Sequence, residues 1–336
     1  MKYAILRAPH PNSRYDAALD VLSLAEAGVM LEKLGTGAKP ELFVLNGLRL
    51  IAFESEPLEQ SQIDKIARMS CLLALFAVES TTLTPLEFAP PVVCAKDMPS
   101  ILKYKGKTNE VFTRFLLNMA LFSSKQPLDG RLCVLDPMCG RGTTLFCAFG
   151  LGLDSFGIEA DKKEVDEGAK FAKSYFEQER MKFTLEKSSL TLEKGRSAPL
   201  YSFISAPTAE LFRSGATTRL EMACGDAKDC AKLTGRRSFD AIVTDLPYGV
   251  AHGNTQSRRG SETLRQLEDM LPLWVKKLKR GGCAAFSFNT YATTQAQIRR
   301  ACEKAGLTPR EGGYYDGLEH RVEQAINRDI AVARLD

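Results

Sequence analysis

The 336-residue chain lacks the features that a metal centre, a disulfide framework or a membrane span requires. It has three histidines, far apart in sequence, and its nine cysteines are scattered and form no Cys-x-x-Cys pair. This usage is typical of reduced thiols packed as small apolar side chains, and it argues against a structural zinc site. The longest apolar run, around Leu72 to Val78, is much shorter than the roughly 18–20 residues that span a bilayer. The N-terminus also lacks the apolar core of a signal peptide, so we expect a cytoplasmic protein without a bound metal.

The spacing of apolar residues in 1–80 predicts the order β-α-β-β-α-β, that of a small ferredoxin-like α+β domain. Helical periodicity runs from Tyr15 to Leu34. Asn46-Gly47 lies between two apolar segments, which is a strong hairpin signal because both turn positions need positive φ. Residues 81–107 are rich in proline and are predicted to be a linker.

Residues 108–336 alternate strand and helix signals, which predicts parallel βαβ units and a doubly wound α/β sheet. The C-terminal part departs from this pattern, because residues 310–317 and 328–335 are predicted as two strands without a long helix between them. We expect them to form an antiparallel pair at the end of the sheet. The polar segment 180–218, rich in Ser and Lys, has no predicted place in this fold.

The first motif is an apolar strand that ends in Asp136 and continues into a glycine loop and a helix. Gly140 and Gly142 permit positive φ and a close approach of the backbone to a ligand. The third glycine of a dinucleotide-binding fingerprint is replaced by Leu145, and no P-loop lysine follows. An acid at this position suits a cationic ligand, and S-adenosylmethionine carries both an ammonium and a sulfonium group.

Two further acids follow later strands of the predicted sheet. Glu159 ends the next strand, about 20 residues after the glycine loop, where carboxylates grip ribose hydroxyls. Asp226 follows a third strand and suits an acceptor for the adenine amino group. Since the ends of parallel strands meet at one edge of the sheet, these acids are expected to line the same donor site.

The fourth motif, Asp245-Leu246-Pro247-Tyr248, follows the strand FDAIV and indicates the reaction. An exocyclic amine on a nucleobase is a poor nucleophile because its lone pair is delocalised into the ring. The Asp245 carboxylate and the Leu246 carbonyl are expected to accept its two N–H bonds, with Pro247 fixing the turn. Tyr248 is expected to stack on the base. Methyl transfer then depends on alignment of the amine with the donor.

The motifs DPMCGRGTT, GIE, GD and DLPYG resemble those of Rossmann-fold S-adenosylmethionine-dependent amino-methyltransferases. With KGKTNEVFTRFLLNMAL and EHRVEQAINRDIAV, they resemble the THUMP-associated tRNA guanine-N2 methyltransferases and their rRNA relatives over about residues 100–336. The resemblance implies a Rossmann-like methyltransferase domain at 108–336. This sequence differs from the family motifs at two positions: Arg141 stands where a small residue is usual, and Leu246 stands where proline is commoner. The implied donor contacts are Asp136, Gly140, Gly142, Glu159, Asp226, Thr108 and Asn109, and the implied base contacts are Asp245, Pro247 and Tyr248.

Charge is unevenly distributed, although the formal net charge is only +4. Residues 1–100 hold nine basic and twelve acidic side chains, whereas residues 251–310 hold eleven and four. A basic segment in a nearly neutral protein indicates a polyanionic partner. Arg258 and Arg259, just beyond Tyr248, are the predicted phosphate contacts.

These observations favour methylation of guanine N2 in RNA, with transfer RNA as the preferred substrate and no membrane partner. Two other enzymes remain open: an rRNA guanine-N2 methyltransferase and a DNA adenine-N6 methyltransferase, which uses a similar acid-x-Pro-aromatic loop. The acidic first 100 residues make a poor DNA-recognition domain. A non-catalytic RNA-binding protein with a relic donor site is a third class, which predicts erosion of the four motifs.

Overall fold

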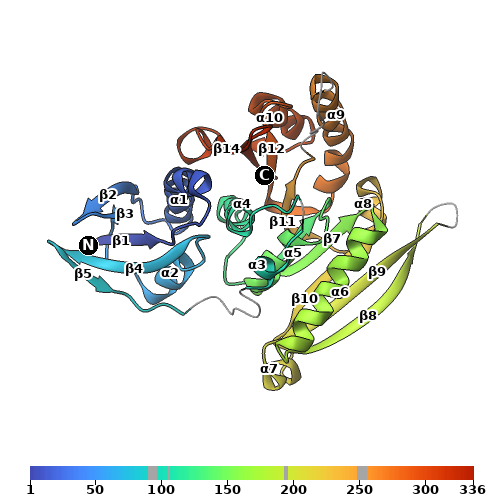
Figure 1. Ribbon diagram of the computed structural model, residues 1–336, viewed down its shortest axis with the longest axis horizontal. Helices are drawn as coiled ribbons and strands as arrows, with labels where there is room; N and C mark the ends of the chain where they lie inside the picture. The colour runs from blue at the N-terminus through green and yellow to red at the C-terminus, as the bar shows by residue number, and fades with distance from the viewer. Residues whose placement is uncertain (90–96, 105, 193–195, 248–255) are drawn as a thin grey trace.

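The computed structural model describes residues 1–336 except 90–96, 105, 193–195 and 248–255, and it leaves out the side chains of Arg14 and residues 256–261. Two β-sheets lie side by side with helices between and around them (Figure 1). Among the described residues, no helix is both long enough and apolar enough to cross a membrane.

The smaller sheet has the strand order β2-β3-β1-β4-β5, and every neighbouring pair is antiparallel. The predicted ferredoxin-like order is therefore confirmed, with β5 added at one edge. Asn46 and Gly47 both have positive φ in the turn between β2 and β3, as the hairpin signal predicts. The elements are β1 (Lys2–Arg7), α1 (Ser13–Lys33), β2 (Glu41–Leu45), β3 (Leu48–Glu54), α2 (Gln60–Ile66), β4 (Leu72–Glu79) and β5 (Thr82–Pro85).

The larger sheet follows the order β13-β15-β12-β11-β6-β7-β10-β9-β8, and β14 pairs with β15. Its five central strands, from β12 to β10, run parallel, which confirms the doubly wound α/β prediction. Its parallel strands are β6 (Cys133–Asp136), β7 (Asp154–Glu159), β10 (Thr218–Cys224), β11 (Phe239–Asp245) and β12 (Leu278–Asn289); its antiparallel strands are β8 (Lys182–Thr191), β9 (Ser197–Ala206), β13 (Thr308–Pro309), β14 (His320–Glu323) and β15 (Ile326–Arg334).

Alternating side chains of the central strands pack against helices on opposite faces of the sheet. On β11, Ala241 and Val243 join the core cluster that contains α4, whereas Ile242 joins the cluster that contains α9 and α10. This alternation is the period-two pattern of a strand buried on both faces. The helices of this part are α3 (Met98–Ile101), α4 (Glu110–Ser123), α5 (Thr143–Gly150), α6 (Lys162–Gln178), α7 (Ala209–Arg213), α8 (Cys230–Thr234), α9 (Gln256–Val275) and α10 (Gln295–Lys304).

The edges of the larger sheet differ from the prediction. An antiparallel C-terminal pair is present, but the prediction of its first strand at 310–317 is wrong, because that strand is β14. Gly312, Gly313 and Gly317 all have positive φ, and the segment contains the short 3-10 helix η3 (Gly313–Tyr315) instead of a strand. The polar insertion at 180–218 forms the hairpin β8–β9, which extends the sheet beyond β10 (Figure 1).

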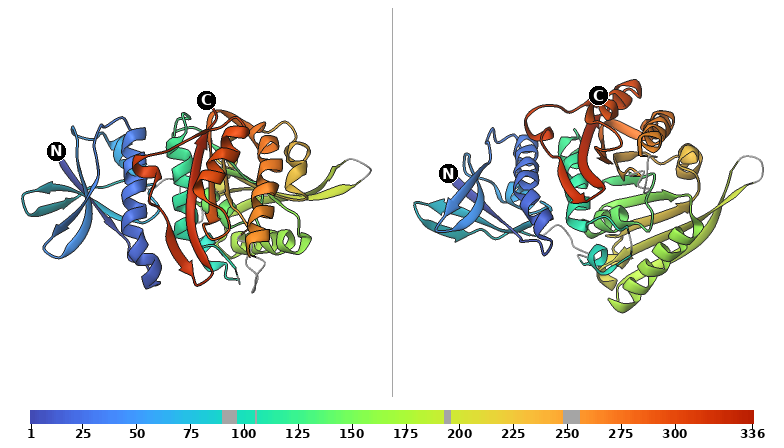
Figure 2. Two further views of the ribbon diagram at one scale, coloured as in Figure 1. Left: turned by 90° about the horizontal axis from the view of Figure 1, so that it is seen from above. Right: turned by 45° about the horizontal axis from the view of Figure 1, so that its top comes forward.

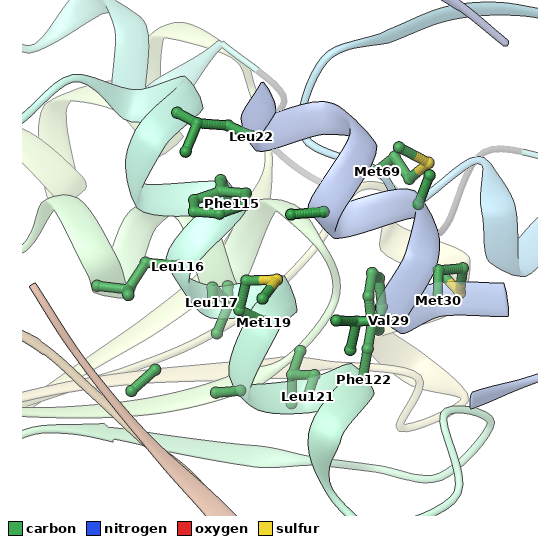
Figure 3. Packing of buried hydrophobic residues seen from close by; sticks show 14 of the residues in the cluster. Leu22, Val29, Met30, Met69, Phe115, Leu116, Leu117, Met119, Leu121 and Phe122 are labelled. Carbon is green, nitrogen blue, oxygen red and sulfur yellow. The ribbon is translucent and has the colours of Figure 1, made fainter. Parts of the chain in front are cut away.

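The segment 81–107, predicted as a linker, contains the edge strand β5 and the short helix α3. The division into a domain at 1–80 and a domain at 108–336 remains a prediction, because one hydrophobic cluster contains side chains from both parts. Helix α1 packs along α4, and Leu22 and Val29 of α1 lie near Phe115 and Phe122 of α4 (Figure 3).

A buried carboxyl group lies within this α1–α4 contact. Glu26 of α1 is fully buried. Its carboxylate accepts hydrogen bonds from the Asn118 amide at 2.6 Å, the Ser70 backbone at 2.9 Å and the Ser70 hydroxyl at 2.7 Å. Burial raises the pKa of this carboxyl from 4.5 to about 7, although the hydrogen bonds from Ser70 and Asn118 oppose the shift. The two parts of the chain therefore share a protonation-sensitive contact.

We predict that Glu26 makes stability fall as the pH rises. Because the folded protein holds this proton more tightly than the unfolded chain, the unfolding free energy should decrease between about pH 4.5 and 7. Glu26→Gln stays neutral and should reduce that decrease by about 2 kcal/mol. Urea unfolding of both proteins at pH 5 and pH 7.5 measures this change in unfolding free energy. Glu32→Gln, at an exposed position of the same helix, is the control and should keep the wild-type pH dependence. Equal pH dependence in wild type and Glu26→Gln would contradict the assignment.

Candidate active site

The carboxyl ends of the parallel strands meet where the order of the sheet reverses. Strand β6 lies between β7 and β11. The strands that follow β6 along the chain therefore lie on both sides of it, first β7 and β10 on one side and then β11 and β12 on the other. Such a switch point is where open α/β sheets leave room for a ligand. Asp136 ends β6, Glu159 ends β7 and Asp245 ends β11, while Asp226 follows β10. The structure thus places the four acids predicted from sequence along one edge of the sheet.

A cavity of about 240 Å³ lies over the end of β6. Both Asp136 and Asp245 line it, so acids from two neighbouring strands face one space. Its apolar wall includes Met138 and Phe112. Of the other residues predicted from sequence, the cavity is lined by Thr108, Gly140, Leu246 and Pro247.

Asp136 is the least exposed acid of this cavity, at 2%. Burial raises the pKa of its carboxyl to about 6, and the negative charge of Asp245 adds to the effect. Hydrogen bonds from Thr144 and from the Met138 backbone, the latter at 3.0 Å, partly oppose the shift. A buried carboxylate that is costly to ionise is stabilised by a cation, so the site is electrostatically suited to an ammonium group.

A second cavity of about 220 Å³ adjoins the first, and Met138 lines both. Glu159 and Asp226 line this second cavity together with apolar side chains such as Ile158 and Met270. The Glu159 carboxylate accepts the backbone N–H of Gly140 at 3.0 Å and that of Asp161 at 2.8 Å. Its orientation is therefore fixed from both sides before any ligand arrives.

The glycine loop has the backbone that the sequence predicts. Gly140 and Gly142 have φ values of 53° and 97°, in the left-handed region that favours glycine. A Cβ on Gly142 would lie 3.3 Å from the Phe146 ring. Arg141, which replaces a small residue between them, forms an ion pair with Glu164 at 2.8 Å, so its charge is directed to α6. The replacement is thereby accommodated.

Asp245 is held by partners from distant parts of the chain. The Thr108 hydroxyl donates a hydrogen bond to its Oδ2, and the Arg328 guanidinium lies 3.9 Å from the same oxygen. The backbone N–H of Leu246 donates to the Ser287 carbonyl at 2.9 Å, which anchors the turn to β12. The Leu246 side chain is buried, so only its backbone is suited to contact a ligand.

Some predicted site residues lie elsewhere. Asn109 lines a different cavity, caps α4 by accepting the N–H groups of Val111 and Phe112, and bonds to His10 at 2.8 Å. Gly142 is the N-cap of α5 and is not among the residues that line the first cavity. Tyr248 lies outside the described residues. Arg258 and Arg259 belong to α9, but their side chains lie outside the description.

Sequence reasoning did not predict several residues at or beside this site, and three of them bear on its chemistry. Tyr104, in the predicted linker, lines the first cavity and lies under the Arg141 guanidinium at 4.8 Å. Met138 separates the two cavities, and its position inside DPMCG was the available signal. Arg328 pairs with Asp245, and only its place in the segment EHRVEQAINRDIAV pointed to it. Among the described residues, no group of three or more potential metal ligands occurs.

The described residues fit S-adenosylmethionine. The buried carboxylate of Asp136 would suit its amino group, and Glu159 and Asp226 would offer acceptors in a cavity whose apolar side chains suit its adenosine part. The first cavity also leaves Asp245 and Pro247 facing the same space, where a second molecule has access to the end of β11.

Comparison with known proteins gives distant structural likenesses. No protein-family model matches the chain, and no curated protein matches it significantly. TrmN from Thermus thermophilus is similar at 13% identity and a TM-score of 0.44, covering 100% of both chains. A TehB-like SAM-dependent methyltransferase from Corynebacterium glutamicum is similar at 16% identity and a TM-score of 0.35, over 64% of this chain and 85% of that one. Precorrin-6y C5,15-methyltransferase from Geobacter metallireducens is similar at 11% identity and a TM-score of 0.39, over 73% and 99%. Likenesses at this level do not assign an activity, which has to come from the site.

We predict that Asp136 controls donor affinity. Asp136→Asn keeps the shape but loses the charge, so the Kd for S-adenosylmethionine should rise about tenfold to a hundredfold. Wild-type affinity should fall below about pH 6, where the carboxyl becomes protonated, whereas the variant should show no such fall. Isothermal titration calorimetry at pH 5 and pH 7.5 measures both effects. Asp269→Asn, at an exposed position of α9, is the control and should bind like wild type. Unchanged affinity in Asp136→Asn would remove Asp136 from the site.

Proposed function

We propose that this chain is an S-adenosylmethionine-dependent methyltransferase that acts on an exocyclic amine of a nucleobase in RNA, with guanine N2 in transfer RNA as the preferred target. The observation that supports it most directly is one cavity lined by both Asp136 and Asp245. The first carboxylate suits the cationic donor, and the second suits an N–H donor such as an amine. A donor and an acceptor of the methyl group would then occupy one space.

The residues at the end of β11 would orient the amine. Asp245 accepts a hydrogen bond from Thr108 and lies near Arg328, so its carboxylate is restrained from two sides. Pro247 limits the backbone of the turn, and the Leu246 N–H is fixed to Ser287. A carboxylate oxygen and a backbone carbonyl would accept the two amine N–H groups and turn the nitrogen lone pair toward the donor. Holding the amine nitrogen in line with the methyl group of the donor lowers the free-energy barrier to methyl transfer.

The donor cavities would hold the other reactant at a fixed place. When bound, S-adenosylmethionine supplies an electrophilic methyl group. Asp136 would bind its amino group, and Glu159 and Asp226 would accept hydrogen bonds from its ribose and adenine, as the resemblance implies. Because Met138 lines both cavities, it would contact the donor between these two regions.

The choice of RNA and of guanine N2 is supported by sequence. Together with DLPYG, the segments DPMCGRGTT, KGKTNEVFTRFLLNMAL and EHRVEQAINRDIAV resemble the THUMP-associated enzymes and their rRNA relatives. The excess of basic residues in 251–310 supplies positive charge in the segment that follows β11 and Asp245 along the chain. Tyr248 and Arg258 and Arg259 remain proposed contacts to the base and its phosphates.

We predict that Asp245→Ala separates methyl transfer from donor binding. Loss of the carboxylate should reduce the rate about a hundredfold or more, because the amine is no longer oriented. Donor affinity should stay within about twofold or improve, since the Asp245 charge opposes ionisation of Asp136. Asp245→Asn retains one acceptor oxygen and should fall between wild type and Asp245→Ala.

The assay transfers a labelled methyl group to unmodified transfer RNA transcripts, digests them to nucleosides and identifies the product by mass spectrometry. N2-methylguanosine is the expected product. N6-methyladenosine, or labelling of DNA alone, would replace the guanine-N2 proposal by the adenine-N6 alternative. Full activity in Asp245→Ala would contradict the orienting role, whatever the base.

A further inference from the structure

A third cavity, of about 360 Å³, adjoins the proposed base site. It shares two lining residues, Tyr104 and Thr108, with the cavity that contains Asp136 and Asp245. Because the Thr108 hydroxyl donates to Asp245, this wall is in direct contact with the proposed base-orienting carboxylate. A polymer whose base enters the proposed site would have its neighbouring nucleotide within reach of this space.

The cavity is built from both parts of the chain. Asn12 directly precedes α1 and Tyr15 lies in its first turn, whereas Arg321 and Arg328 come from β14 and β15. Helix α1 and the β14–β15 hairpin lie side by side in both views of Figure 2, and the two elements are in contact. The smaller sheet is thus coupled to this cavity through α1, although the first 100 residues are acidic overall.

Positive charge dominates the walls. The cavity is lined by four basic side chains and by one acidic side chain, Glu110. Glu110 forms an ion pair with Lys107 at 3.0 Å, and Arg328 lies 3.9 Å from Asp245. Within the described parts of the chain, neither Lys103 nor Arg321 forms an ion pair, and both side chains are exposed. Their charges are therefore available to an anion.

One of the lining residues, Tyr15, carries a buried hydroxyl group. Tyr15 is 7% exposed and lines the cavity, yet its hydroxyl has no hydrogen-bond partner among the described residues. Buried polar atoms are paired in the great majority of cases, and an unpaired one calls for an explanation. A ligand in the cavity supplies one, because a phosphate or ribose oxygen would pair with this hydroxyl.

We propose that this third cavity binds the nucleotide next to the target base, with Lys103 and Arg321 contacting its phosphate and the Tyr15 hydroxyl donating to its backbone. The proposal rests on the proposed function, because the adjoining cavity has to receive a base of the same RNA. It gives the N-terminal part a direct role in substrate binding that needs no overall positive charge. It also assigns phosphate contacts to Lys103 and Arg321, in addition to those proposed for Arg258 and Arg259.

Binding of fluorescently labelled, unmodified transfer RNA, measured by anisotropy at several salt concentrations, tests this proposal. Lys103→Ala and Arg321→Ala should each weaken binding about fivefold to tenfold and lower the slope of log K against log salt by about 0.7–0.9. Tyr15→Phe should weaken binding about threefold and leave thermal stability unchanged or higher, since it removes a hydroxyl that the free protein does not satisfy. Donor affinity should stay at the wild-type value in all three.

Matched controls are Lys170→Ala on α6 and Arg300→Ala on α10, both exposed and lining none of the three cavities. They should keep the wild-type affinity and salt slope. Wild-type RNA binding and salt slope in Lys103→Ala, Arg321→Ala and Tyr15→Phe would overturn this subsite and leave the proposed function standing. Absence of RNA binding by the wild-type protein would overturn both.

A titration with guanosine monophosphate and with inorganic phosphate distinguishes a free anion from a polymer. Neither compound should displace transfer RNA when its concentration is below about a hundred times the Kd of the protein for transfer RNA. Competition by either compound at concentrations near that Kd would assign the cavity to a free anion and contradict the RNA subsite.

Discussion

The buried carboxylate of Asp136 is the constraint around which the site is organised. It lies at the end of β6, the strand at which the order of the sheet reverses, and it has almost no access to water. Ionising a carboxyl group there is costly, as its raised pKa shows, and a bound cation removes that cost. The surrounding features follow from it. The glycine loop brings backbone close to the same space, Glu159 is oriented by that loop, and Asp245 lines the same cavity as Asp136.

The packing of α1 against α4 determines where the N-terminal part lies relative to this site. Helix α4 also packs on β11 and β12, so it links the small sheet to the strands whose ends carry the site. Thr108, just before α4, bonds to Asp245, and Tyr15 on α1 lines the neighbouring cavity. At the C-terminal side, the Tyr314 ring lies so close to α1 that a Cβ on Gly28 would approach it to 2.5 Å. The N-terminal part is therefore packed through α1 against both α4 and the C-terminal segment around Tyr314.

The sequence predicted the parts of the structure that depend on local pattern. Asp136, Glu159, Asp226 and Asp245 could be placed together because each follows a strand, and parallel strands align their ends. The β8–β9 hairpin was missed because β8 is mostly exposed and its hydrophobic alternation is limited to Phe183 and Leu185. The strand predicted at 310–317 was wrong because three glycines with positive φ outweigh the strand preference of Tyr314 and Tyr315. Arg328 and Tyr104 reach the site only through tertiary folding, which no local pattern encodes.

We propose that one methyl donor spans the two cavities on either side of Met138. A crystal structure of the protein with S-adenosylhomocysteine tests it most directly, since this product keeps the amino group, ribose and adenine of the donor. The account predicts its amino group at hydrogen-bonding distance from Asp136, its ribose against Glu159 and its adenine beside Asp226. Binding at another place, or in the opposite direction with adenine at Asp136, would contradict it.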